Sequence, residues 1–280
     1  MFKNLKIKKI FHTNMTRLLL ILVTFIYMLP LLWMVTTSLK ANQDLYASPP
    51  KIISIPLVFE NYKKATEYFP FWRYFKNSVI ITTGVIVGTL FSSPLVAYSF
   101  SKINWKGRDI LFYIMLSTIM LPFAVTMIPQ FLIFKKLGWI NTFLPLIIPS
   151  FFGNPLSIFL VRQFFMTIPD SLLDAARIDG ASELQIYTRI MLPLAKPVLF
   201  LITLFTFIGA WNNYLGPLIY LTDESKYPLA LGLPQFLDRY GTYWNWMMAA
   251  ATISVVPTII FFAFAQKYLI EGIKLTGLKE

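Results

Sequence analysis

Six stretches of this 280-residue sequence contain no Asp, Glu, Lys or Arg, and they constrain the fold more than any other feature. They cover residues 18–39, 77–101, 110–134, 143–161, 198–222 and 245–266, and each is 19 to 25 residues long. A helix of about 20 apolar residues crosses the ~30 Å hydrocarbon core of a bilayer. Barrel strands are about ten residues long and alternate polar with apolar side chains, unlike these stretches. The sequence therefore predicts an all-α membrane protein, with six transmembrane helices in a single domain over residues 1–280.

The fourth stretch, residues 143–161, is the least regular of the six. It contains Pro145, Pro149, Gly153 and Pro155. Proline removes a backbone donor and clashes with the preceding helical turn. We therefore expect this span to be broken or kinked.

The charged residues lie between the spans, and their distribution predicts the orientation of the chain. The net charge is +12, from 25 basic and 13 acidic residues. An even number of spans places both termini on one side, and that side carries 15 of the basic residues, with a dense cluster before the first span. The positive-inside rule then predicts cytoplasmic N- and C-termini in the cell membrane, with contact to membrane lipid. No single basic patch forms, so we expect no nucleic-acid partner.

The first apolar stretch is too long for a cleaved signal peptide. Its 22 residues exceed the 7–15 residues usual for such segments, and no small-residue cleavage motif follows. We expect it to be retained as a span.

The composition also excludes most catalytic chemistry. The chain has no Cys and a single His, His12, which lies outside the spans. Uncharged spans offer neither a proton relay nor paired carboxylates. The phosphate-binding pattern G-x-x-x-x-G-K-[ST] is absent from the sequence. We therefore expect no enzyme activity, no catalytic residues, no metal site and no cofactor.

Residues 162–197 connect the fourth and fifth predicted spans on the predicted cytoplasmic side, and this loop is long enough to form secondary structure. Ser171 and Asp174 are spaced as a helix-capping pair, and Ser182 and Gln185 repeat that spacing. Gly180 separates the two starts because glycine accepts backbone angles that other residues avoid. The sequence predicts a helix–Gly–helix hairpin that ends at two prolines, Pro193 and Pro197.

The apolar residues of this hairpin are spaced to share helical faces. The first set is Leu172, Ala175 and Ala176, and the second is Leu184, Tyr187, Ile190 and Met191. Amphipathicity alone allows either a helix pair resting on the bilayer or a docking element for a soluble partner. The small alanines beside charged Asp174, Arg177 and Asp179 favour docking, since a bilayer-lying face normally carries larger apolar groups.

The most polar point within a span is Trp211-Asn212-Asn213-Tyr214. A buried amide in lipid needs a partner. Either these asparagines hydrogen-bond to neighbouring helices, or the four residues contact a hydroxylated ligand in a translocation pathway, with the rings stacking on sugar faces.

Residues 174–193 carry a longer spaced pattern: Asp174-Ala175-Ala176, three residues, Gly180, nine residues, then Ile190-Met191-Leu192-Pro193. It resembles the EAA loop of ABC importer permeases, Glu-Ala-Ala-x3-Gly-x9-Ile-x-Leu-Pro, with Asp174 in place of the usual Glu. Other pieces resemble the carbohydrate-uptake subfamily. They are Thr37-Ser38-Leu39-Lys40, Asn77-Ser78, Trp211 to Tyr214 with Pro217-Leu218, and Gln266-Lys267-Tyr268 through Glu271-Gly272.

The resemblance implies an ABC type I importer permease fold and a set of partners. These are a second homologous permease subunit, two ATPase subunits that hydrolyse ATP, and an extracytoplasmic sugar-binding protein. The loop would act as a coupling helix that docks in a cleft of the ATPase and transmits its closure. The implied coupling residues are Asp174, Ala175, Ala176, Asp179, Gly180, Ala181, Ser182 and Pro193.

Three alternatives stay open at the level of sequence. The solute is a sugar or a related polar compound such as glycerol phosphate, which the sequence does not distinguish. A membrane scaffold would use the hairpin only for binding. A secondary carrier or channel would need no ATPase, although the uncharged spans disfavour proton coupling.

Overall fold

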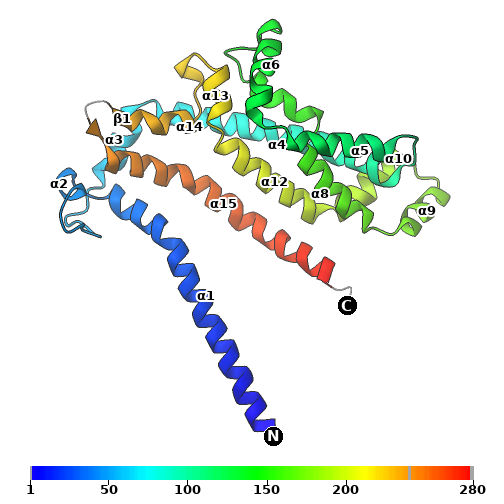
Figure 1. Ribbon diagram of the computed structural model, residues 1–280, viewed down its shortest axis with the longest axis horizontal. Helices are drawn as coiled ribbons and strands as arrows, with labels where there is room; N and C mark the ends of the chain where they lie inside the picture. Colours follow the sequence, from blue (N-terminus) through cyan, green and yellow to red (C-terminus); the bar gives the residue numbers. More distant parts are fainter. Residues whose placement is uncertain (1, 239–240, 278–280) are drawn as a thin grey trace. The chain divides into compact units, whose positions relative to one another are not determined.

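The structure is a computed structural model, which describes the backbone of residues 2–238 and 241–277 and the side chains of residues 14–237 and 243–267. The longest helices are α1 (Phe2–Ser38), α4 (Phe71–Lys102), α6 (Phe123–Lys136), α8 (Pro155–Met166), α12 (Lys196–Trp211) and α15 (Trp244–Gly277). Shorter ones are α2 (Asn42–Leu45), α3 (Glu60–Tyr68), α5 (Arg108–Ser117), α7 (Leu144–Ile147), α9 (Asp170–Ile178), α10 (Glu183–Ile186), α11 (Leu192–Leu194), α13 (Leu215–Tyr220) and α14 (Leu229–Gly232). Figure 1 shows their order along the chain.

The remaining elements are single turns and one small strand pair. The 3₁₀ turns are η1 (Thr118–Met120), η2 (Ile148–Phe152), η4 (Glu224–Lys226) and η5 (Leu233–Phe236), and η3 (Tyr187–Met191) is a π-helical turn. The antiparallel pair is β1 (Leu237–Asp238) and β2 (Gly241–Thr242). The mostly helical structure agrees with the predicted all-α class.

The elements group into two compact units. Residues 1–69 and 235–254 form the first unit, and residues 70–234 and 255–280 form the second. Within the second unit, α4 is the central helix, because α8, α12 and η2 all pack against it (Figure 1).

Four helical segments are long and apolar enough to cross a membrane, and they match four of the predicted spans. They are Asn14–Ser38, Phe71–Lys102, Leu144–Met166 and Trp244–Lys267. Two further pairs of helices qualify if each bent pair counts as one span. The described residues therefore contain four to six candidate spans, and the count of six stays a prediction.

The predicted span 110–134 is a bent pair of helices rather than one straight helix. The first part ends at Met120, the second starts at Phe123, and their axes differ by 101°. The cause is local: Leu121 and Pro122 both have extended backbone angles, and Pro122 stands at the N-cap of α6.

The predicted span 198–222 also differs from the structure. Its helix, α12, ends at Trp211, and a separate short helix, α13, follows after Asn212 to Tyr214. Asparagine competes for backbone hydrogen bonds, and here the Asn213 carboxamide oxygen accepts one from the Gly216 N–H at 3.1 Å. The polar run therefore ends the helix.

The predicted break in span 143–161 is present between η2 and α8. Gly153 has a φ of +97°, which favours glycine. The next residue, Asn154, caps α8 because its side-chain oxygen accepts a hydrogen bond from the Ser157 N–H at 3.0 Å, and Pro155 begins the helix.

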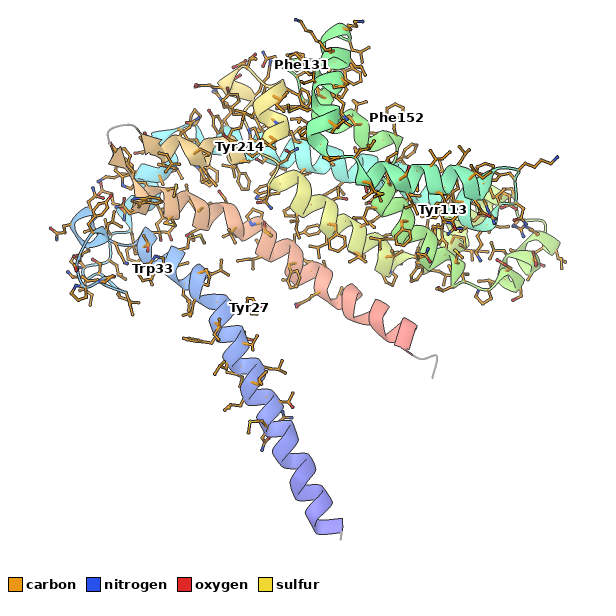
Figure 2. The ribbon with its side chains drawn as sticks, in the orientation of Figure 1. Tyr27, Trp33, Tyr113, Phe131, Phe152 and Tyr214 are labelled. Atoms are coloured by element: carbon orange, nitrogen blue, oxygen red, sulfur yellow. The ribbon has the colours of Figure 1, made fainter. Side chains whose placement is uncertain are left out.

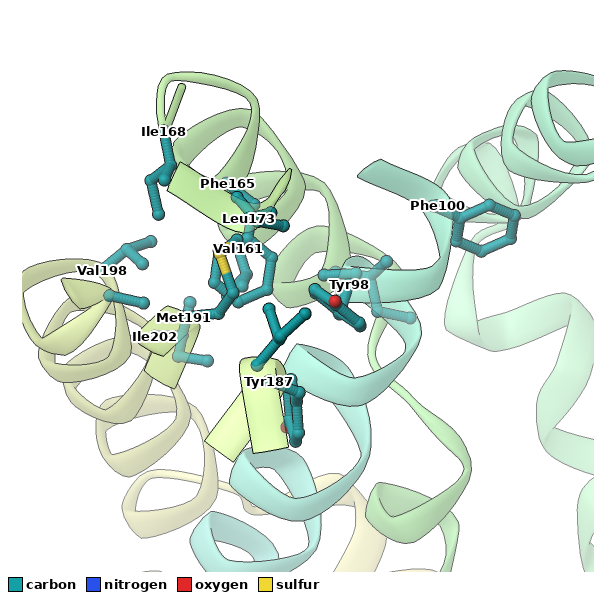
Figure 3. Close-up of a cluster of buried hydrophobic side chains, with 14 of the residues drawn as sticks. Tyr98, Phe100, Val161, Phe165, Ile168, Leu173, Tyr187, Met191, Val198 and Ile202 are labelled. Atoms are coloured by element: carbon teal, nitrogen blue, oxygen red, sulfur yellow. The ribbon is translucent and has the colours of Figure 1, made fainter. Parts of the chain in front are cut away.

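A cluster of buried apolar side chains lies in the second unit, where α4, α8 and α12 meet the hairpin (Figure 3). Tyr98 comes from α4, Val161 and Phe165 from α8, and Ile202 from α12. We call these side chains and their buried neighbours the packed cluster. Its members are Ala97, Tyr98, Phe100, Phe112, Ile158, Val161, Phe165, Ile168, Leu173, Ile186, Tyr187, Met191, Ala195, Val198 and Ile202.

The first unit is held together by side-chain amides. The Asn61 amide nitrogen donates to the backbone oxygens of Ser38 (2.8 Å) and Lys40 (2.9 Å), at the end of α1. The Asn245 amide, at the start of α15, donates to Asn42 Oδ1 at 2.8 Å. The bond from Asn61 to Ser38 satisfies a carbonyl group that the end of α1 leaves without a helical partner.

Candidate functional site

The first helix of the hairpin, α9, begins one residue earlier than its predicted cap. Pro169 occupies the N-cap position, so the prediction that Ser171 caps the helix with Asp174 is wrong. Proline at this point has an extended ψ of 136°, and Asp170 follows in the first turn. The ammonium of Lys102 donates to Asp170 Oδ1 and to the Ile168 carbonyl oxygen, both at 2.6 Å. This ion pair lowers the pKa of Asp170 and ties the hairpin to the end of α4.

The end of α9 is a Schellman motif built around Gly180. The Gly180 N–H donates to the Arg177 carbonyl oxygen at 3.0 Å, and the Ala181 N–H donates to that of Ala176 at 2.9 Å. Gly180 has a φ of +83°, and the accompanying Ala176 and Ala181 side chains both pack against the packed cluster. Gly180 therefore reverses the chain between the two helices, as the sequence predicts.

The second helix starts with the predicted capping box. The Ser182 hydroxyl accepts from the Gln185 N–H at 3.3 Å, and the Gln185 side chain accepts from the Ser182 N–H at 2.8 Å. After α10 the chain forms the π-helical turn η3, then α11, which contains Pro193. The axis then bends by 76° into α12.

The inward face of the hairpin is partly different from the predicted one. In α9 the buried side chain is Leu173, at 1 % exposure, and Ala176 is half-buried beside it, whereas Leu172 is exposed. Leu172, Ala175 and Ala176 do not therefore form one buried face. In the second helix Tyr187 and Met191 are buried as predicted, whereas Leu184 is exposed and the buried residue before them is Ile186.

The outward face of α9 is a compact patch of mixed character. Ser171, Asp174, Ala175 and Ile178 are all exposed, and the spacing of three, four and seven residues places them on one side of the helix. Ile178 is 87 % exposed. We call these four residues the docking face. An exposed apolar side chain beside a carboxylate suits a protein contact.

A chain of charged contacts connects the docking face to α4. Arg177 donates to Asp174 Oδ1 at 2.8 Å and to Glu183 Oε1 at 2.9 Å. The Tyr98 hydroxyl of α4 donates to Glu183 Oε2 at 2.5 Å. The hydrogen bonds from Arg177 and Tyr98 lower the pKa of Glu183, and the bond to Glu183 raises that of Arg177. Asp174, the acid of the spaced pattern, is thus paired within its own helix.

The side chains of the predicted group Trp211, Asn212, Asn213 and Tyr214 do not form one surface. Trp211 is buried at 6 % exposure and stacks on Phe207 with a centroid distance of 5.5 Å. The Asn212 amide donates back to the Ile208 carbonyl oxygen at 2.9 Å, and Tyr214 is exposed (Figure 2). Of the four, Asn213 lines a cavity.

That cavity has a volume of about 480 Å³ and lies in the second unit, against the middle of α4. The lining residues come from α4, the η2–α8 region and α12, with Asn213 following α12. They are Ile81, Val85, Thr89, Leu146, Pro149, Ser150, Gly153, Asn154, Leu156, Ser157, Leu160, Phe205, Thr206, Gly209, Ala210 and Asn213. None of these residues is charged, and six of them carry a hydroxyl or a carboxamide group. We call this space the solute cavity.

Residues 80–275 match the family model described as "Binding-protein-dependent transport system inner membrane component". The chain belongs to this family. The matched region contains both the hairpin and the solute cavity. The protein is therefore the membrane permease subunit of an ABC importer.

Relatives of the permease cover almost its whole length. An arabinooligosaccharide transport permease, AraQ of Halalkalibacterium halodurans, is 34 % identical over 92 % of this chain and 93 % of its own. The trehalose/maltose permease MalG of Thermococcus litoralis is 34 % identical over 92 % and 94 %. The sn-glycerol-3-phosphate permease UgpE of Escherichia coli is 30 % identical over 93 % and 95 %.

The fold of the permease also matches a solved structure. A crystal structure of a bacterial ABC transporter that imports the acidic polysaccharide alginate contains a chain with a TM-score of 0.79 and 27 % identity. The match covers 91 % of this permease and 95 % of that chain. The predicted importer permease fold is confirmed by this likeness.

Several residues of the permease that shape the hairpin were not predicted from the sequence. Glu183 and Tyr98 are 85 positions apart, and nothing in the local sequence links them. Leu173 and Ile178 are ordinary apolar residues whose opposite orientations depend on packing. The structural roles of Gly180 and Ser182 could be predicted from the sequence, because they depend only on neighbouring residues.

Proposed function

We propose that this permease forms half of the pathway of an ATP-driven importer for a sugar or short oligosaccharide. It would work with a second homologous permease, two ATPase subunits that hydrolyse ATP, and an extracytoplasmic sugar-binding protein. Both termini and the α9–α10 hairpin would lie on the cytoplasmic side. The observation that carries this proposal is the docking face: a capped hairpin exposes a patch of mixed apolar and charged character and connects it to α4, α8 and α12.

The solute cavity supports a neutral, hydroxylated solute. Its lining offers hydroxyl and carboxamide groups from Thr89, Ser150, Asn154, Thr206 and Asn213, which exchange hydrogen bonds with sugar hydroxyls. The names of AraQ and MalG, and of the alginate importer, also refer to carbohydrates. Asn213 is the residue of the predicted group that we retain as a substrate contact.

Glycerol phosphate is the second candidate because UgpE is almost as similar as the sugar permeases. A phosphate group is normally bound by Arg, Lys or clustered backbone N–H groups. The described residues that line the solute cavity include no cation. The cavity therefore favours the sugar over the phosphate ester.

Coupling would follow the contacts of the hairpin. The exposed face of α9 would bind in a cleft of the ATPase, with Ile178 as its apolar contact and Asp174 as its charged one. Leu173 and Ala176, on the other face, pack into the packed cluster, which contains side chains of α4, α8 and α12. Because close-packed interiors transmit displacement, movement of the hairpin would reach the helices that line the solute cavity.

The test is uptake in proteoliposomes that contain the complete complex and its binding protein. We expect ATP-dependent accumulation of a radiolabelled arabino- or malto-oligosaccharide and no accumulation of sn-glycerol 3-phosphate. Uptake that persists without ATP would indicate a carrier. A complex whose ATPase activity does not respond to solute and binding protein would indicate a scaffold.

The docking role is tested separately with Ile178→Asp. Because Ile178 is exposed, this change leaves the packing of the permease intact, and we expect solute-stimulated ATP hydrolysis and uptake to fall together. Ile178→Leu is the matched control and should retain both activities. Normal transport by Ile178→Asp would remove the hairpin from the mechanism without affecting the assignment to the importer family.

A further inference from the structure

A second pocket lies in the first unit, at the end of α1, and the importer mechanism makes no use of it. Its volume is about 310 Å³, and it is lined by Trp33, Thr37, Lys40, Leu45, Tyr46, Trp244 and Met248. Three of these side chains are large aromatics, and one is a lysine. We call this space the Lys40 pocket.

The Lys40 side chain is buried and points back along α1 rather than into water. Its residue exposure is 3 %, and its ammonium lies 4.2 Å from the centroid of the Trp33 ring. Trp33 precedes Lys40 by seven residues, so the side chain runs back along α1 towards the apolar part of the helix. A lysine at the end of a span normally extends the other way, into water.

The ammonium is short of partners. Among the described residues, none makes a hydrogen bond or ion pair with the Lys40 ammonium. Asp44 favours its charge from a distance, but the Asp44 carboxylate is already bound by Lys51 at 2.5 Å and by the Ser54 hydroxyl. Burial accordingly lowers the pKa of Lys40. Contact with Trp33 and the nearby end of α1 offsets part of this cost, but an ammonium has three donors to satisfy.

A second polar group in the pocket also lacks a partner. The Thr37 hydroxyl oxygen is buried and, within the part of the chain that the structure describes, has no hydrogen-bond partner. Thr37 lies in the last turn of α1, three residues before Lys40, and lines the same pocket. A buried ammonium and a buried hydroxyl that both need an acceptor indicate an anionic oxygen ligand.

We propose that the Lys40 pocket binds a phosphate group, with the Lys40 ammonium and the Thr37 hydroxyl donating to its oxygens and the aromatic side chains enclosing it. The position of the pocket favours the headgroup phosphate of a membrane lipid as the source. The apolar span ends at Ser38, so Lys40 lies where a membrane-crossing helix leaves the hydrocarbon. Trp and Tyr gather at that level of the bilayer, and the pocket contains Trp33, Trp244 and Tyr46.

The experiment uses the complete, delipidated complex and native mass spectrometry with three probes: phosphatidylglycerol, diacylglycerol and inorganic phosphate. Lys40→Ala removes the cation, and Thr37→Val removes the hydroxyl while keeping the shape. Lys63→Ala is the matched control, because Lys63 is in the same unit and its side chain is 75 % exposed. Thermal stability of each complex is measured alongside.

We expect wild type and Lys63→Ala to retain one phosphatidylglycerol that Lys40→Ala binds about tenfold more weakly, with a smaller loss in Thr37→Val. Diacylglycerol, which has no phosphate, should not compete. If inorganic phosphate alone occupies the pocket and lipid does not, the phosphate site stands and the lipid source is wrong. Equal lipid and phosphate binding by wild type and Lys40→Ala overturns the proposal.

If Lys40→Ala does not fold, Thr37→Val decides the question by the same measure. If either variant loses its partner permease yet keeps the lipid, the pocket is a subunit contact and the proposal is wrong. These outcomes are independent of uptake, so they separate this proposal from that of the sugar importer.

Discussion

The two ends of one helical group differ sharply in packing. Near the hairpin, α4, α8 and α12 contribute buried side chains such as Ala97, Phe165 and Ile202, which have 0 % exposure. Further along, the same three helices line the solute cavity of about 480 Å³. One end is closely packed, and the other encloses an open space. We propose that movement of the hairpin is transmitted through the packed cluster, and that the solute binds in the separate solute cavity.

The largest expected effect comes from removing the packing. Phe165→Ala leaves a void in the packed cluster, and we expect the free energy of unfolding to fall by about 3–5 kcal/mol. Phe152→Ala is the control, because this ring is 83 % exposed (Figure 2) and should change stability by less than about 0.5 kcal/mol. Thermal unfolding of the purified complex measures both. Equal melting temperatures would mean that the packed cluster is not the stable end.

The next effect concerns the close approach of α4 and η2, beside the solute cavity. A Cβ atom at Gly88 would lie 2.1 Å from Ser150 Oγ and 2.7 Å from Phe151. Gly88→Ala therefore forces the two elements apart, and we expect it to cost about 1–3 kcal/mol. The measurement is thermal unfolding together with uptake, and both should decline. Unchanged unfolding would show that the wall of the cavity tolerates expansion.

A smaller effect is expected at the charged contacts that connect the hairpin to α4. Glu183→Gln weakens the bonds to Arg177 and Tyr98, and because the Glu183 side chain is 48 % exposed we expect a cost of about 1 kcal/mol or less. The folded-state pKa of Glu183 lies below its ordinary value of 4.5. Its contribution is therefore complete above pH 4.5 and is lost as the pH falls through the folded-state pKa.

The measurement for Glu183 is unfolding as a function of pH. Glu183→Gln should destabilise the complex at neutral pH and remove part of its acid sensitivity. The ratio of solute transported to ATP hydrolysed should also fall, which a purely structural role would not require. Wild type and variant with parallel pH profiles would contradict the assigned ion pair.

The smallest effect has the opposite sign. A Cβ atom at Gly209, in the wall of the solute cavity, would meet no atom within 4 Å among the described residues. Since alanine is the better helix former, Gly209→Ala should stabilise the complex by about 0.5–1 kcal/mol. The larger Gly209→Leu should fill the cavity and reduce uptake without loss of stability. Destabilisation by Gly209→Ala would mean that the cavity is smaller than the structure shows.

The sequence predicts the features that depend only on interactions between residues close together in the chain. The Ser182–Gln185 capping box, the turn at Gly180 and the break near Gly153 each depend on neighbouring residues. The bend at Pro122 also has a local cause, but it was not predicted. Residues 110–134 contain no charge and are long enough for one span, and span prediction considers only charge and length.

The remaining features depend on contacts between distant segments. In α9 the apolar residues spread over more than half of the helix circumference, with Leu173 and Ile178 near its two edges, so only packing determines that Leu173 faces inward and Ile178 outward. The solute cavity needs three helices to form, and Trp211 is buried by aromatic neighbours that periodicity does not reveal. For that reason we propose only Asn213, of the four predicted pathway residues, as a solute contact.

The separation between a packed and an open end can be measured directly with single cysteines, because the natural chain has none. Thr206→Cys places a thiol in the solute cavity, and Ile202→Cys places one in the packed cluster a single helical turn away on α12. The comparison is the rate of modification by a small thiol reagent in the assembled importer. We expect Thr206→Cys to react quickly and to be protected by the transported oligosaccharide, whereas Ile202→Cys stays unreactive. Equal reactivity at the two positions, or no protection at Thr206→Cys, would contradict the account.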